Sequence, residues 1–144
     1  MRKETYVEFK KRQQEEVNNF PIAYAFNDQQ LQEALVKLGV KLEDCVTVFN
    51  HGDIVRKEDA PKLVAMLRQH TKDLKEALKD EEFAEAAFLY EMDNHEYAIN
   101  WDGDDDVLAC FSLDYKELCE MGLERAYGRA RQKHYKHAEE WEMI

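Results

Sequence analysis

Apolar residues recur at intervals of three and four along much of the chain, and this spacing most limits the possible fold. Clear stripes run from Leu31 to Leu38 and from Leu63 to Leu78. Side chains at that spacing lie on one face of an α-helix, which can then pack against a core. The 144 residues include only two prolines and five glycines, so few positions would interrupt helices. The pattern predicts a mainly α-helical chain.

Residues typical of helix ends set the expected boundaries. Helices are predicted over residues 4–18, 27–38, 59–79, 81–94 and 114–140. Asn27 with Gln30, and Asp114 with Glu117, have the spacing of a capping box. Gly39 is typical of a helix C-terminus, and Asp59 precedes a helix with proline in its first turn.

Short β-branched and aromatic runs predict a small β element. Residues 22–26 have extended character, and residues 45–50 and 54–56 could pair as a hairpin around the turn "NHGD". A chain of this length is ordinarily one domain. We therefore expect a single compact domain over residues 1–144, mainly α with a minor β element, with five to six helices.

The charge is concentrated in one segment. Twelve of the 31 acidic residues, and no Lys or Arg, lie between Asp80 and Tyr115, although the net charge of the whole chain is only −11. We call residues 80–115 the acidic segment. It would repel nucleic acids and anionic membranes and attract basic surfaces. The alternative is a solvated face that keeps the protein soluble.

The densest part of the acidic segment is "WDGDDDV", residues 101–107, which fits two structures. Aspartates complement the dipole of a helix N-terminus, whereas Gly103 fits a hairpin turn. Residues 24–45 weakly resemble residues 97–118, and this possible internal repeat favours the helix, with Asn100 capping as Asn27 does.

The acidic stretch does not match an EF-hand. That loop needs glycine at its sixth position and a bidentate Glu at its twelfth, where this sequence has Val107 and Leu113. A looser Ca²⁺ or Mg²⁺ site at Asp104 and Asp106 is a remaining candidate. His134 and His137 are a second metal candidate, but no third ligand is evident, and basic neighbours favour a solvated helix face.

His95 and Glu96 form the most enzyme-like pair, since a histidine beside a carboxylate can carry out acid–base chemistry. Adjacent residues do not face each other on a helix, however. The alternative is that Asn94 ends a helix and Tyr97 packs in the core. Cys45 near His51 is a nucleophile candidate, against the commoner role of cysteine in packing.

Further features limit the class of protein. The chain has no apolar run long enough to span a membrane and no signal-peptide pattern at its start. Its three cysteines form no CxxC pair, which favours free thiols and a cytoplasmic location.

A basic stretch between Arg125 and Lys136 could pair with the acidic segment of this chain or of a second copy.

Several short stretches resemble a known family. "NNFP", "AF" with "KLG", "IVRKEDAP" and "NHEY" resemble a family of small, uncharacterised proteins of Firmicutes and other gut bacteria, often encoded on phages and mobile elements. "NHGD" departs from the Gly-rich stretch associated with that position. The resemblance implies a mostly helical domain and a mobile-element context, and it implies no activity.

We expect a non-enzymatic interaction protein without a cofactor. In its specific form it docks on the basic surface of a nucleic-acid-handling enzyme, as DNA-mimicking anti-restriction and anti-CRISPR inhibitors do. The expected partner-binding residues are Asp102, Asp104, Asp105, Asp106, Glu81, Glu82 and Glu85. The alternative is a small metal-dependent hydrolase using His95 and Glu96. A homodimer is left open.

Overall fold

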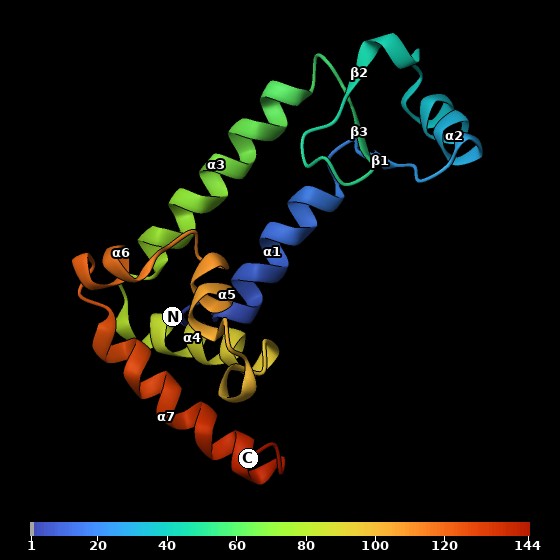
Figure 1. Ribbon diagram of the computed structural model, residues 1–144. Helices are drawn as coiled ribbons and strands as arrows, with labels where there is room; N and C mark the ends of the chain where they lie inside the picture. The colour runs from blue at the N-terminus through green and yellow to red at the C-terminus, as the bar shows by residue number, and fades with distance from the viewer. Residues whose placement is uncertain (1) are drawn as a thin grey trace. The chain divides into compact units, whose positions relative to one another are not determined.

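The computed structural model describes residues 2–144 (Figure 1). Within these residues the chain is mainly α-helical with a small β element, as the helical spacing predicts. There are seven α-helices, one more than the upper expectation: α1 (Tyr6–Asn18), α2 (Asp28–Leu38), α3 (Ala60–Ala77), α4 (Glu81–Asn94), α5 (Gly103–Ala109), α6 (Tyr115–Glu120) and α7 (Glu124–Glu140). The remaining elements are the 3₁₀ helices η1 (Leu42–Asp44) and η2 (Tyr97–Ile99), and the strands β1 (Ala23–Tyr24), β2 (Cys45–Val46) and β3 (Asp53–Arg56).

The chain divides into two compact units. The β-containing unit comprises residues Lys11–His70, and the helical unit comprises Thr71–Ile144 together with the start of the chain as far as Lys10. The structure defines each unit by itself, so the expected single domain over residues 1–144 stays a prediction.

The β-containing unit is built on a three-stranded antiparallel sheet in the order β1–β3–β2. The predicted hairpin pairs Val46 with Val55, and the extended run after Pro21 adds β1 to the other edge of β3. Val55 and Leu63 are fully buried and form a core with Ile22. Helix α2 packs on β1 and β3, and it begins at the predicted Asn27 cap and ends at Gly39 in the left-handed conformation.

One carboxylate organises the β2–β3 loop. Asp53 accepts hydrogen bonds from the backbone N–H groups of Val48, Phe49 and His51 and from the Thr47 hydroxyl. Burial acts to raise the pKa of Asp53, but these hydrogen bonds outweigh it and hold the pKa below its usual value. The turn chemistry read in "NHGD" therefore has a structural role.

The helical unit has an aromatic core. The ring of Phe88 on α4 packs edge-on against Phe111, at 5.1 Å between centroids, and against Tyr127 of α7, at 5.2 Å. Tyr6 of α1 adds a ring against Phe111. Helices α4 and α7 pack along each other, and η2 contacts both. None of the helices in the described chain is long and apolar enough to cross a membrane.

The expected long helix over residues 114–140 is wrong, because the chain breaks between α6 and α7. Gly122 has a φ of 70°, in the left-handed region that favours glycine. Its N–H binds the carbonyl of Cys119, and the N–H of Leu123 binds that of Leu118, which is the Schellman pattern of a helix end. Leu118 and Leu123 are both buried, and this packing stabilises the break. The Asp114 cap is confirmed.

Residues 97–111 form helix rather than hairpin, as favoured above. Asp104, Asp105 and Asp106 lie in the first turn of α5. Asn100 does not cap this helix as Asn27 caps α2. It ends η2, and Asp102 precedes α5 without a capping side chain. The residues before α5 form the 3₁₀ helix η2, whereas the residues before α2 include the strand β1. The two segments of the weak internal repeat therefore differ in local structure.

Candidate functional site

The acidic residues of α4 are largely paired within the helical unit. Glu85 accepts hydrogen bonds from Arg129 and, at 2.6 Å, from Lys133, both on α7. Arg129 also reaches Glu81, at 3.5 Å. The hydrogen bond from Lys133 is the main cause that lowers the pKa of Glu85. The basic stretch of the last helix therefore pairs with the acidic segment of the same chain, which was one of the two alternatives.

Asp93 holds two histidines. Its carboxylate lies 2.7 Å from Nδ1 of His134 and 2.9 Å from Nδ1 of His137. Nε2 of His134 accepts a hydrogen bond from the Ala98 N–H at 2.9 Å, so Nδ1 carries the proton and donates it to Asp93. His134 is fully buried, so the interpretation of a solvated face is wrong for this residue. With both ring nitrogens engaged, His134 positions the η2 backbone.

Two of the α5 aspartates have structural partners. Oδ1 of Asp104 accepts hydrogen bonds from the hydroxyls of Tyr97 (2.7 Å) and Tyr127 (2.6 Å). Burial and this hydrogen bond raise the pKa of Tyr97 to about 12, so the phenol remains protonated at neutral pH and donates. Asp106 accepts from the Asn100 amide at 2.9 Å. Asp104 and Asp106, the pair suggested by the sequence as a Ca²⁺ or Mg²⁺ site, thus both accept hydrogen bonds from side chains of the helical unit.

Gly103 explains why a glycine interrupts the aspartates. A Cβ at this position would lie 2.9 Å from the Tyr97 ring and 3.2 Å from the Tyr97 carbonyl oxygen. Glycine therefore permits the close approach of η2 to the start of α5. A hairpin turn is not needed to explain why glycine occurs among the aspartates.

The segment between η2 and α5 is exposed. Trp101 has a relative exposure of 102%, and Ile99 of 52%. A shallow hollow of about 420 Å³ lies beside them, lined by Ala98, Ile99, Asn100 and Trp101. Asp102 and Asp105 follow in the chain, both exposed, and within the described residues neither side chain makes an ion pair or hydrogen bond. We call Ile99, Trp101, Asp102 and Asp105 the Trp101 surface.

His95 and Glu96 have different surroundings. The Glu96 side chain is exposed and its backbone is left-handed, with a φ of 51°, whereas His95 is half-buried and ends α4. Nε2 of His95 lies 3.3 Å from Sγ of Cys110, and Glu91 is the third member of this group. Sequence reasoning missed Glu91 and Cys110, although the four-residue spacing of Glu91 and His95 places both on one face of α4.

Neither Cys45, the nucleophile candidate, nor Cys110 has the surroundings of an activated thiol. The Cys45 thiol donates to the Lys41 carbonyl, and burial raises its pKa. Burial and the neighbouring Glu91 raise the pKa of Cys110 to about 11, so the thiol is protonated at neutral pH. A reactive cysteine needs the opposite shift, because the thiolate is the attacking species.

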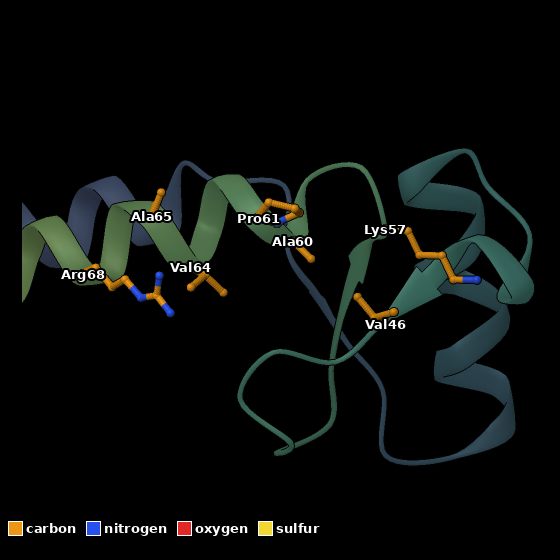
Figure 2. Close-up of a pocket in the computed structure, with 7 residues that line it drawn as sticks. All are labelled: Val46, Lys57, Ala60, Pro61, Val64, Ala65 and Arg68. Atoms are coloured by element: carbon orange, nitrogen blue, oxygen red, sulfur yellow. The ribbon is translucent and has the colours of Figure 1, made fainter.

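The β-containing unit has an apolar hollow of about 450 Å³ (Figure 2). It lies along the start of α3 and is lined by Val46, Lys57, Ala60, Pro61, Val64, Ala65 and Arg68. Lys57 and Arg68 stand at its two ends with apolar side chains between them (Figure 2). None of these residues is a histidine, cysteine or acid, so the lining offers no group for acid–base or nucleophilic chemistry at neutral pH.

The model of one protein family, described as "Family of unknown function (DUF7659)", matches residues 5–133. This match agrees with the resemblance to an uncharacterised family. No curated protein and no solved structure matches the chain.

Proposed function

We propose that this chain, which belongs to the family of unknown function DUF7659, is a non-enzymatic interaction protein that binds a basic protein through the Trp101 surface. The observation that carries the proposal is the complete exposure of Trp101 beside Asp102 and Asp105, whose side chains have no partner among the described residues. An exposed tryptophan gains the most from burial at an interface, and tryptophan is enriched among the residues that dominate binding energy.

The contacts within the helical unit narrow the set of partner-binding residues. Asp102, Asp105 and Glu82 are exposed carboxylates that accept no side-chain hydrogen bond from the described residues, and they remain candidates. Glu85 and Asp104 already have buried or charged partners, so a partner would have to compete with those contacts. The side chains of Glu81 and Asp106 each have one polar contact with the described part of the chain, so they are less available than the first three and more available than Glu85 and Asp104.

We further propose that the partner is a nucleic-acid-handling enzyme. Such enzymes present arginine and lysine where phosphates bind, and carboxylates beside an aromatic ring can occupy the same groups. The twelve acidic residues of the acidic segment favour this class. A cytoplasmic DNA-mimicking inhibitor from a mobile element, of the anti-restriction or anti-CRISPR kind, is the specific form of this proposal. The absence of CxxC pairs among the three cysteines supports a reducing compartment.

The hydrolase alternative has less support. Within the described residues no contact joins the side chains of His95 and Glu96, and Glu96 faces solvent. An acid–base pair must reach a common substrate atom, so this pair does not favour an enzyme.

Capture from bacterial lysate tests the proposal. The baits are wild type, Trp101→Ala, Asp102→Asn/Asp105→Asn, and the control Glu43→Gln/Glu58→Gln, which removes the same charge from exposed positions of the β-containing unit. We expect wild type and control to retain one basic protein that both Trp101-surface variants lose.

Addition of duplex DNA then tests the partner class. If the partner uses its nucleic-acid site, DNA should release it from the wild-type bait. Retention of the same protein by all four baits would overturn the Trp101 surface, and retention despite saturating DNA would overturn mimicry. A wild-type bait that captures nothing would contradict the interaction proposal.

A further inference from the structure

We propose that Glu91, His95 and Cys110 together bind one divalent transition-metal ion of the zinc class. These are the His, Cys, Asp and Glu residues of the described chain whose ligand atoms converge, all within 4.8 Å of one another. They share no residue with the Trp101 surface, so this site and the proposed function can succeed or fail separately.

Two helices bring the three ligands together. Glu91 and His95 lie four positions apart at the C-terminal end of α4, and Cys110 directly follows α5. The Sγ atom of Cys110 and the Nε2 atom of His95 are 3.3 Å apart. Ligands that share a tetrahedral ion at about 2.0–2.3 Å stand roughly 3–4 Å from each other, so these two atoms already have a suitable separation.

The carboxylate of Glu91 is already positioned. It is 1% exposed, and its Oε2 atom accepts hydrogen bonds from the Tyr6 hydroxyl at 2.6 Å and from Lys10 at 2.9 Å. Oε1 has a longer contact with Lys10, at 3.3 Å, so it is the oxygen more available to an ion. Such outer partners hold a ligand in position and tune its affinity for metal.

The ligand types select the ion. Thiolate and imidazole are borderline or soft ligands that suit Zn²⁺ and its neighbours, whereas Mg²⁺ and Ca²⁺ require oxygen ligands. Because the thiol must lose its proton to bind, the ion replaces that proton. Glu91 and the Cys110 thiolate would neutralise a divalent ion, and nearby Lys10 would then favour an anion as fourth ligand.

Three protein ligands leave one coordination position open. His95 and Cys110 are both half-buried, so water can reach this side of the group. Structural zinc sites are closed by four protein ligands, whereas sites with three bind water or a small molecule in the fourth position. The site therefore has the composition of an open centre.

Cobalt titration of the untagged, reduced protein tests the site. Co²⁺ bound to a thiolate gives a charge-transfer band, and tetrahedral coordination gives visible d–d bands. We expect both to saturate at one equivalent and to disappear when Zn²⁺ is added. Excess Mg²⁺ should leave them unchanged.

Matched variants assign the ligands. Cys110→Ser should abolish the charge-transfer band, whereas Cys45→Ser and Cys119→Ser should retain it. His95→Gln should weaken binding and the matched His51→Gln should not. Tyr6→Phe removes only a hydrogen bond to Glu91, and we expect it to weaken affinity by about tenfold or more. Circular dichroism of each variant shows whether the helices remain.

Three results would overturn the proposal. These are the absence of a thiolate band in folded wild type, its persistence in Cys110→Ser, and binding that depends instead on His134 and His137. The last result would locate the ion at Asp93, which holds both of those histidines.

Discussion

Along α4, Glu81, Glu85 and Asp93 meet cations and histidines of α7, whereas two aspartates around Trp101 have no side-chain partner within the described residues. Glu85 and Asp93 belong to the first region, and Asp102 and Asp105 belong to the second. Both regions belong to the acidic segment, which contains no Lys or Arg. A run of like charges therefore does not define a binding surface, because helices that follow later in the chain decide which charges remain available.

The largest effect is expected where the first region is most buried. His134→Ala should lower the free energy of unfolding by about 2–4 kcal/mol, because it opens a cavity and leaves the Ala98 N–H without an acceptor. Denaturant unfolding measures the loss. His137→Ala is the control, since its side chain is 35% exposed and should cost less than about 1 kcal/mol. Equal losses of unfolding free energy in the two variants would contradict the structural role of buried His134.

The same contrast between a paired and an exposed carboxylate occurs within the first turn of α5, at the neighbours Asp104 and Asp105. Asp104→Ala should cost about 1.5–3 kcal/mol, because the hydroxyl of buried Tyr127 loses its acceptor. Asp105→Ala should change stability by no more than about 0.5 kcal/mol. Thermal unfolding of both variants checks the difference, and similar melting temperatures would contradict the assignment of Asp104 to structure.

Glu85 should make a smaller contribution to the free energy of unfolding, and this contribution should depend on pH. Its folded-state pKa is depressed by Lys133 and Arg129, so its stabilisation is present above the unfolded pKa and is lost as pH falls through the folded value. Glu85→Gln should cost about 0.5–1 kcal/mol at pH 7, and the difference from wild type should shrink below about pH 4. A constant difference across this range would argue against the ion pairs.

The smallest effect on stability is expected at the exposed ring. Trp101→Ala should leave the free energy of unfolding within about 0.5 kcal/mol of wild type, because the side chain buries no surface in the chain alone. A clear loss of stability in this variant would show that Trp101 packs within the fold, and would remove the basis for a binding role.

Local signals in the sequence predicted much of the fold. Helix α4 has the predicted bounds, and the caps at Asn27 and Asp114 form as their spacing predicts. The break at Gly122 was missed, because an isolated glycine ends a helix only if the next residue finds a buried site, as Leu123 does.

The candidate sites were less predictable, because their partners come from distant positions. The basic neighbours of His134 suggested exposure, and only the packing of α7 on α4 buries its ring. Glu91 and His95 are visible as a four-residue spacing, but Cys110 joins them through the fold. The exposure of Trp101 follows from a short turn that no periodic pattern describes.

The salt dependence of partner affinity tests most directly the claim that the exposed aspartates, rather than the paired ones, form the binding surface. The dissociation constant of the captured partner would be measured at several salt concentrations for wild type, Asp102→Asn/Asp105→Asn and the Glu43→Gln/Glu58→Gln control. The account predicts weaker binding and a shallower salt dependence for the aspartate variant alone, because ion pairs at the interface are lost. Identical curves for all three proteins would contradict it.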